Sequence, residues 1–428
     1  MTKKGAAARR FAFELLSGVL DKGQSLADQL GANAKQSDTL GAVDVARAQR
    51  LANTALRHRG RIDSYLDVYL RRKPPKSVQN ILRLGVTEIH IDGIPVHAAV
   101  DGAVGLAKTH PKSRHASGLI NAVLRKAADD QDRWQKTRDP EPTGWIAQRL
   151  RNTYGKATCS AIFDSHRALP PLDLTPRSQL EASELATQLE GTLLPTGTVR
   201  LRHWGRVSGL PGYEEGAWWV QDAAAALPVR MLGEIEGHHA LDVCAAPGGK
   251  TLQLSAAGAR VTALDASHRR LVRLEKNLCR TKLKADVVTR DALTWSPEQT
   301  FDTVVLDAPC SATGTIRRHP DLPYIRQEQE VEALAKIQMQ LLERAWTWIR
   351  SGGQLLYCTC SLLPDEGETQ IEQFLSSHLD AVCARPDPAQ LGILPDWIDS
   401  AGGLRLRPDF WPQYGGMDGF YAAVLRKV

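Results

Sequence analysis

The sequence predicts a multidomain protein with an all-α amino-terminal bundle, a small α/β linker domain and an α/β carboxyl-terminal domain built on a mainly parallel sheet. Two patterns and a boundary predict this fold class. Apolar positions recur at helical spacing in the first 140 residues, short apolar strands alternate with helices after residue 223, and prolines separate the two regions. With 428 residues and 43% hydrophobic composition, the chain can form two or three cores.

The amino-terminal region carries several apolar stripes at helical spacing. The clearest stripe consists of Val78, Ile81, Leu82, Gly85 and Ile89. Further stripes lie in the segments 11–19, 62–69, 96–104 and 118–125. Positions that repeat at i, i+3, i+4 and i+7 lie on one face of a helix. We expect these faces to form the core of a bundle and not a ligand site.

The positive charge of the chain is concentrated in the same region. Residues 1–140 carry 24 Lys and Arg against 14 Asp and Glu, whereas the rest carries 30 against 34. Such an excess attracts a phosphate backbone regardless of base sequence, although a solvated helical surface is the alternative. The basic cluster comprises Arg71, Arg72, Lys73 and Lys76. It favours RNA binding, because Pro74 and the next proline keep this basic turn outside the flanking helices.

Composition also excludes several classes of protein. Seven cysteines without framework spacing indicate a reducing cytoplasm and not a disulfide scaffold. Cys358 and Cys360 are too close together for a C-x-x-C metal pair, so we expect no metal site. No apolar run is long enough to span a bilayer. Glu14 interrupts the apolar part of the amino terminus, so we expect an amphipathic helix there and no signal peptide.

A linker region follows the proline-rich segment 139–142. A helix is expected over residues 145–154, and Pro170-Pro171 begins a short α/β region that extends to about residue 222. Trp218 and Trp219 near its end could stack on bases, but packing at a domain junction is the favoured interpretation.

A strand–turn–helix segment indicates the cofactor. The strand at residue 241 leads into a turn of Cys244, Ala245, Ala246, Pro247, Gly248, Gly249 and Lys250. Small residues let a ligand approach the backbone, and the helix that follows offers free N–H groups. Asp265 ends the next strand, 21 positions after Cys244, and Asp291 follows the third strand. An acidic side chain at that separation takes ribose hydroxyls. Because the turn lacks G-x-G-x-x-G, a ligand with ribose and adenine but no pyrophosphate, S-adenosylmethionine, fits better than a nicotinamide. An ordinary strand-to-helix turn is the alternative for this segment alone.

Two further strands each end in a motif with a cysteine. One strand leads to Asp307 and Cys310, and another leads to Cys360. Because parallel strands present their carboxyl ends to one crevice, we expect both thiols and the carboxylate to face a single pocket.

The motifs VCAAPGGKT, LDAS, DAPCSATGTIRRHPD, YCTCSLLPDEGE and GGMDGFYAAVLRK together resemble the RNA cytosine-5 methyltransferases with two motif cysteines, over residues 210–428. The amino-terminal half, with its closing INAVLRK, resembles the NusB-like bundle of the RsmB/Fmu branch of that family. The resemblance implies a NusB-like RNA-binding domain over 1–140, a linker helix and small α/β domain over 141–222, and a Rossmann-like methyltransferase domain over 223–428.

The resemblance also implies residue roles. Carbon 5 of cytosine is a poor nucleophile, so a thiolate first adds to carbon 6. The family pattern makes Cys360 this nucleophile, Asp307 the group at N3, and Cys310 the residue that assists release; chain order alone does not distinguish the thiols. Lys250 is expected to contact cofactor or base, or else to lie over the sheet. Arg317, Arg318 and His319 follow the Cys310 motif and are expected to hold RNA phosphates.

The implied substrate is 16S ribosomal RNA at cytosine 967, free or within a partly assembled small subunit, and we expect a monomeric cytoplasmic enzyme that makes 5-methylcytosine. Alternatives are another RNA target such as tRNA, a DNA cytosine-5 methyltransferase, and a non-catalytic RNA-binding or antitermination factor. A DNA enzyme would not need Cys360, and a binding factor would not need the cofactor turn.

The segment 172–178 departs from the family's usual Arg-x-Asn strand. The remaining cysteines, Cys159, Cys279, Cys358 and Cys383, are expected to be buried and structural.

Overall fold

The computed structural model describes residues 3–33 and 39–428 and divides into two compact units. One unit comprises Met1–Gly144 together with Arg318–Arg326, and the other comprises Trp145–Arg317 and Gln327–Val428. The chain therefore leaves the second unit after Arg317, contributes one short segment to the first, and returns. Among the described residues, none of the helices combines the length and apolar composition needed to cross a membrane.

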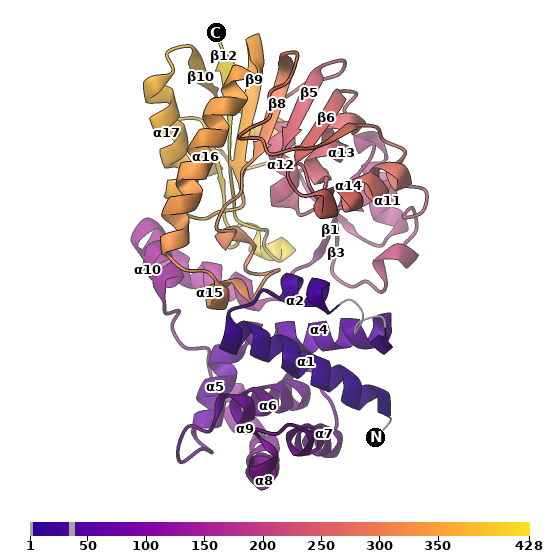
Figure 1. Ribbon diagram of the computed structural model, residues 1–428, viewed down its shortest axis with the longest axis vertical. Coiled ribbons are helices and arrows are strands. Elements are labelled where there is room, and N and C mark those ends of the chain that lie inside the picture. Colours follow the sequence, from indigo (N-terminus) through magenta and orange to yellow (C-terminus); the bar gives the residue numbers. More distant parts are fainter. Residues whose placement is uncertain (1–2, 34–38) are drawn as a thin grey trace. The chain divides into compact units, whose positions relative to one another are not determined.

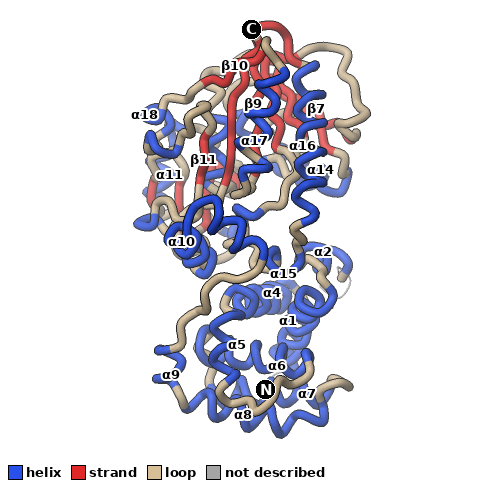
Figure 2. Tube along the Cα trace, turned by 90° about the vertical axis from the view of Figure 1, so that its left-hand side faces the viewer, coloured by secondary structure: helices blue, strands red, loops and turns tan. Residues whose placement is uncertain are grey.

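The first unit consists of helices and loops, as the apolar stripes predict (Figure 2). Its helices are α1 Lys3–Lys22, α2 Leu26–Ala32, α4 Ala42–Arg57, α5 Arg59–Asp67, α6 Lys76–Val86, α7 Val96–Thr109, α8 Ser117–Asp129, α9 Gln131–Lys136 and α15 Leu322–Ile325, with a π-helical turn at Thr87–Ile91. The predicted stripe of α6 is buried in the core of this bundle. Gly85 in this stripe is required sterically, because a Cβ there would lie 2.6 Å from a methyl group of Leu124 on α8.

The segment Arg318–Arg326 is anchored in the bundle by specific contacts. Asp321 is 4% exposed, and its Oδ2 accepts a hydrogen bond of 2.9 Å from the backbone N–H of Leu26 at the start of α2. Tyr324 donates to the carbonyl oxygen of Leu56 at 3.1 Å, and the guanidinium of Arg59 lies 4.9 Å from the centre of its ring. This part of the loop that follows Cys310 therefore belongs to the helical core.

The second unit contains two sheets. The smaller sheet has the order β2-β3-β1-β4. Its strands are β1 Leu172–Pro176, β2 Thr192–Leu193, β3 Val199–Leu201 and β4 Trp218–Val220, and α10 Trp145–Arg167 and α11 Ala182–Gln188 accompany it. Asp173 and Arg200 form a buried ion pair of 2.6 Å across β1 and β3. The α/β region expected here is present, and it lies in the same compact unit as the larger sheet.

The larger sheet has the order β10-β12-β9-β8-β5-β6-β7, with β11 paired to β12 (Figure 1). Its strands are β5 His239–Val243, β6 Arg260–Asp265, β7 Asp286–Thr289, β8 Phe301–Asp307, β9 Ile349–Thr359, β10 Ala381–Ala384, β11 Leu404–Leu406 and β12 Phe420–Lys427. Strands β7, β6, β5, β8 and β9 are parallel, and β12 is antiparallel to β9. The chain order reverses at β5, which places a ligand crevice at the carboxyl ends of β5 and its neighbours.

Helices cover both faces of this sheet (Figure 1). They are α12 Ala223–Arg230, α13 Gly249–Ala256, α14 His268–Thr281, α16 Gln329–Thr347, α17 Glu368–Ser377 and α18 Pro388–Leu391. Successive residues of a strand point to opposite faces. Val305 accordingly packs with residues of α12 and α13, whereas Val304 and Leu306 pack with residues of α16 and α17. A strand buried on both faces reads as a continuous apolar run, which is the pattern the sequence shows before Asp307.

Candidate active site

A cavity of about 390 Å³ lies at the carboxyl ends of the parallel strands. Its lining residues are Cys244, Ala246, Leu264, Asp265, Ala266, Arg270, Arg290, Asp291, Ala292, Leu293, Asp307, Ala308, Pro309, Cys310, Ile337, Leu341 and Cys360. Motifs far apart in the sequence thus converge on one space at the point where the strand order reverses.

The turn after β5 has an unusual backbone conformation. Cys244 has a φ of 62° and Gly248 a φ of 108°, and the Ala246–Pro247 bond is cis. Gly248 is required at its position, because its φ is positive and a Cβ would lie 2.8 Å from Leu274 of α14. Of the turn residues predicted to bind cofactor, Cys244 and Ala246 line the cavity, while Ala245, Pro247, Gly248, Gly249 and Lys250 are not among its lining residues.

Asp265 ends β6 and lines the cavity although it is only 4% exposed. Its Oδ2 accepts a hydrogen bond of 3.1 Å from the backbone N–H of Ala246, and its Oδ1 accepts one of 2.8 Å from Ser267. Arg270 forms an ion pair of 3.6 Å with the same carboxylate. Asp265 therefore joins the cofactor turn to the next strand, and its role at a ribose stays a prediction. Asp291 also lines the cavity and accepts from the N–H of Leu293 at 2.9 Å.

Lys250 reaches the carboxylate that was expected to engage the base. Its Nζ lies 2.8 Å from Oδ2 of Asp307 and 4.8 Å from the ring centre of Phe420. Burial by itself would lower the pKa of Lys250, but Asp307 and its other acidic neighbours raise it above the ordinary value. The ammonium group therefore stays charged and holds Asp307 at the cavity wall. Asp242 lies in β5, and burial raises the pKa of its carboxyl group to about 7.

The two motif thiols meet in the same cavity. Sγ of Cys310 and Sγ of Cys360 lie 3.5 Å apart, within hydrogen-bond distance for sulfur. The hydrogen bond with Cys360, burial, and the nearby charge of Glu366 raise the pKa of Cys310 well above its ordinary value. Cys310 is therefore held as a thiol that can donate to the sulfur of Cys360. Cys358 is buried, and its Sγ lies 3.7 Å from Oδ1 of Asp307.

A buried polar network lies beside the thiols, and no sequence pattern predicts it. Glu366 is fully buried, and its carboxylate accepts from the backbone N–H of Ser311 at 2.8 Å and from the Ser311 hydroxyl at 2.5 Å. The amide of Gln338 on α16 donates to the same carboxylate at 3.1 Å. Because Ser311 follows Cys310 directly, Glu366 fixes the backbone that carries this thiol.

Other lining residues were also not predicted. Arg270, Arg290, Leu293, Ile337 and Leu341 form much of the remaining wall. Ile337 and Leu341 are four positions apart on α16, so they lie on one helix face, but that spacing is also typical of a core stripe. Nothing in the sequence distinguishes the two uses.

The prediction that Arg317 holds RNA phosphates is wrong. This side chain is 1% exposed and forms ion pairs with Asp222 at 3.1 Å and Asp418 at 2.7 Å. A guanidinium buried in this way ties the chain after Cys310 to the start of α12 and to the carboxyl-terminal region. Arg318 and His319, the next residues, belong to the segment that lies in the helical unit. Their contact with RNA stays a prediction.

The basic cluster of the helical unit is exposed. Arg71, Arg72 and Lys73 lie in the turn before α6, and Lys76 begins that helix. Lys76 also lines a groove of about 680 Å³ on the bundle. The other lining residues are Arg10, Phe13, Glu14, Ser17, Asp21, Lys22, Pro75, Ser77, Leu106, Thr109, His110, Pro111 and Lys112. The cluster is therefore available to a polyanion.

The remaining cysteine and tryptophan predictions have mixed outcomes. Cys159 is buried as expected, but Cys279 is exposed, so the expectation of burial is wrong for that residue. Trp218 and Trp219 are 0% and 3% exposed, in agreement with packing. In the described part of the chain, no cluster of His, Cys, Asp or Glu has the arrangement of a metal site.

Two separate regions of the chain match known protein families. Residues 229–426 match the family model described as 16S rRNA methyltransferase RsmB/F, and residues 6–129 match the NusB family. The ribosomal RNA small subunit methyltransferase B of Erwinia tasmaniensis is 34% identical over 99% of this chain and 100% of its own length. The protein of the same name from Pasteurella multocida is 36% identical over 98% of this chain and 96% of its own.

Solved structures show the same fold at lower identity. The crystal structure of PH0851 has a TM-score of 0.71 at 21% identity and covers 100% of this chain and 99% of that one. The crystal structure of NSun6 from Pyrococcus horikoshii with SFG has a TM-score of 0.56 at 19% identity, over 66% of this chain and 97% of that chain.

Proposed function

We propose that this chain, which belongs to the 16S rRNA methyltransferase RsmB/F family, forms 5-methylcytosine in small-subunit ribosomal RNA with S-adenosylmethionine as methyl donor. The observation that carries the proposal is the pair of sulfur atoms 3.5 Å apart on the wall of a cavity that also presents Asp265, Asp291 and Asp307. A simple binding factor has no use for two adjacent thiols beside a buried carboxylate.

The cavity fits the proposed cofactor in size and chemistry. At about 390 Å³ it lies within the usual range for small-molecule sites. Asp265 and Asp291 supply carboxylates for ribose hydroxyls, and Leu293, Ile337 and Leu341 supply an apolar wall for an adenine ring. When bound, the cofactor supplies an electrophilic methyl group on a sulfonium.

The residues of the chain perform the remaining steps. The thiolate of Cys360 forms a bond to carbon 6, and the electron pair displaced from the 5,6 double bond reaches N3, which takes a proton from the hydrogen-bonded pair of Asp307 and Lys250. Carbon 5 then takes the methyl group. Removal of the carbon 5 proton returns an electron pair to the ring, which re-forms the double bond and expels the sulfur of Cys360.

Cys310 is placed to take that proton. Its pKa is raised in the free enzyme mainly by its hydrogen bond to the sulfur of Cys360. Once this sulfur is bonded to carbon 6 it carries no negative charge, and the chief cause of the shift disappears. Cys310 then ionises more readily and can act as the base. The cytosine must leave its stack to reach both thiols, which favours an unpaired target.

The finer assignment is cytosine 967 of 16S ribosomal RNA, in free RNA or in a partly assembled subunit. The names of the full-length relatives support small-subunit ribosomal RNA as the substrate, and the nucleotide position rests on the motif resemblance alone. The exposed basic cluster from Arg71 to Lys76 supplies the phosphate contacts that a ribosomal RNA substrate needs.

Variants of the two thiols test the mechanism. Cys360→Ala should bind S-adenosylmethionine but transfer no methyl group, because no adduct forms. Cys310→Ala should accumulate a covalent protein–RNA complex, seen as a slow band under denaturing conditions, and the double variant should not. Cys279→Ala, which changes an exposed thiol, is the matched control and should behave as wild type. If Cys360→Ala traps RNA and Cys310→Ala is merely inactive, the two roles are reversed.

A further inference from the structure

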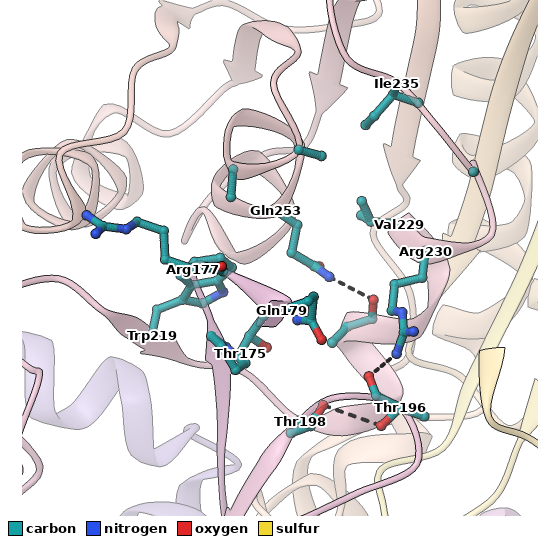
Figure 3. Close-up of a pocket in the computed structure, with 16 residues that line it drawn as sticks. Thr175, Arg177, Gln179, Thr196, Thr198, Trp219, Val229, Arg230, Ile235 and Gln253 are labelled. Carbon is teal, nitrogen blue, oxygen red and sulfur yellow. Dashed lines mark hydrogen bonds between the residues drawn. The ribbon is translucent and has the colours of Figure 1, made fainter. Parts of the chain in front are cut away.

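A second pocket of about 430 Å³ lies away from the thiols, between the small sheet and helices α12 and α13 (Figure 3). Its lining residues are Thr175, Pro176, Arg177, Ser178, Gln179, Thr196, Thr198, Trp219, Ala226, Val229, Arg230, Gly233, Ile235, Gln253, Ala256 and Ala257. None of these residues lines the cofactor cavity.

The pocket has cationic groups and no acidic ones. Its lining includes two arginines and no Asp or Glu. The guanidinium of Arg230 donates to the carbonyl oxygen of Thr196, and no carboxylate of the described residues forms an ion pair with it. Burial lowers the pKa of Arg230 from its ordinary value, with no acidic neighbour to offset the shift. A partly buried cation without a counterion favours an anionic ligand.

Polar groups beside Arg230 are also available. Thr175 is 4% exposed, and its hydroxyl has no hydrogen-bond partner among the described residues. A buried hydroxyl without a partner is uncommon in folded proteins, and a ligand oxygen would satisfy it. Gln179 is a neighbour of Arg230 in the lining, because a Cβ at Gly197 would overlap Oε1 of Gln179 and lie 3.5 Å from Nη1 of Arg230 (Figure 3).

The opposite part of the wall is apolar and rigid. The indole N–H of Trp219 donates to Oε1 of Gln221 at 2.8 Å, and Gln221 donates in turn to Oε1 of Gln253 at 2.7 Å. Gln253 donates to the carbonyl oxygen of Ala226 at 2.8 Å. These bonds fix Trp219, with Val229 and Ile235 completing the apolar surface. An aromatic group next to a cation is the arrangement that receives a base and its phosphate.

We propose that this pocket binds a nucleoside monophosphate unit, with the phosphate at Arg230 and Thr175 and the base against the wall formed by Trp219, Val229 and Ile235. The unit can come from an unpaired nucleotide of RNA or from a free nucleotide, since both present the same phosphate and base. The site is separate from methyl transfer, so it stands or falls independently of the function proposed above.

Full-length protein with its cofactor cavity filled by excess S-adenosylhomocysteine is titrated with uridine 5′-monophosphate and with uridine. We expect the monophosphate to bind at least about tenfold more tightly than uridine and to raise the melting temperature further at each higher concentration, following the logarithm of that concentration. Arg230→Gln should abolish the difference between the two ligands. Thr175→Val, which keeps the side-chain shape, should weaken the binding of the monophosphate severalfold. It provides a second test if Arg230→Gln does not fold.

Arg202→Gln is the matched control, because Arg202 is exposed in the same small domain and does not line the pocket. It should leave both affinities unchanged. A short unstructured RNA then identifies the source: displacement of the monophosphate indicates RNA, and binding of the monophosphate without displacement indicates a free nucleotide. The proposal is overturned if neither compound binds, or if wild type and both pocket variants bind the monophosphate equally.

Discussion

The buried carboxylate of Glu366 should control both the stability of the thiol loop and the ionisation of Cys310. Its two oxygens accept three hydrogen bonds, from the N–H and hydroxyl of Ser311 and from the amide of Gln338. Glu366→Gln keeps the volume of the side chain but replaces one acceptor oxygen with an NH₂ group. The NH₂ group can donate to the Ser311 hydroxyl and so reverse one of the three bonds, but the negative charge that strengthened all three is lost.

The magnitude follows from that loss. A hydrogen bond to a charged group contributes about 1.5–3 kcal/mol and one between neutral groups about 0.5–1.5 kcal/mol, so each of the three bonds loses about 1 kcal/mol. We therefore expect the free energy of unfolding to fall by about 2–3 kcal/mol. The negative charge of Glu366 is also one of the causes that raise the pKa of Cys310. Without it the thiol should ionise at lower pH, and its reaction with an alkylating reagent should be faster at a given pH.

Urea unfolding measures the first effect, and the rate of alkylation of Cys310 against pH, read by peptide mass spectrometry, measures the second. Glu372→Gln on α17 is the matched control, because Glu372 is exposed and should change neither quantity. The reasoning is refuted if Glu366→Gln unfolds at the same urea concentration as wild type, or if the alkylation profile of Cys310 moves to higher pH.

Two further predictions concern the ligands. Asp265→Ala should weaken the binding of S-adenosylmethionine at least about tenfold, measured by calorimetry, because charge-assisted hydrogen bonds of roughly 1.5–3 kcal/mol are lost. Asp265→Asn keeps the shape of the side chain and so separates the effect of charge from that of packing. Unchanged affinity in both variants would remove Asp265 from the site. Reversing the charge of Arg71, Arg72 and Lys76 should weaken RNA binding and flatten its dependence on salt, with cofactor affinity unchanged. An unaltered salt slope would mean that the cluster is only a solvated surface.

The sequence predicted the parts of the site that lie at strand ends. Cys244, Asp265, Asp307 and Cys360 each follow an apolar run, and parallel strands present their carboxyl ends to one crevice. The structure places all four on one cavity. Their convergence follows from strand direction and does not depend on details of side-chain packing, which is why a linear pattern was sufficient.

The failures involve contacts between residues that are distant in the chain. Arg317 lies in a basic stretch that is typical of a phosphate site, but its partners Asp222 and Asp418 are 95 and 101 positions away. Glu366 stands in an acidic turn of ordinary appearance and acquires its role only because Ser311, 55 positions earlier, packs against it. Local periodicity in the sequence cannot predict pairs that are so far apart in the chain. Arg317 and Glu366 are therefore buried structural groups that the sequence pattern does not identify.

The different surroundings of the two thiols give a physical reason for their different roles. Ser311, next to Cys310, is bonded to a buried carboxylate, whose charge opposes the ionisation of Cys310. The carbonyl oxygen of Cys360 accepts from the N–H of Gly314 at 2.9 Å, so the same loop also fixes the position of the second thiol. A thiol that is kept protonated can donate a hydrogen bond to the sulfur of Cys360, 3.5 Å away. In the mechanism proposed above Cys360 is the nucleophile, and Cys310 acts as a base only after Cys360 has reacted.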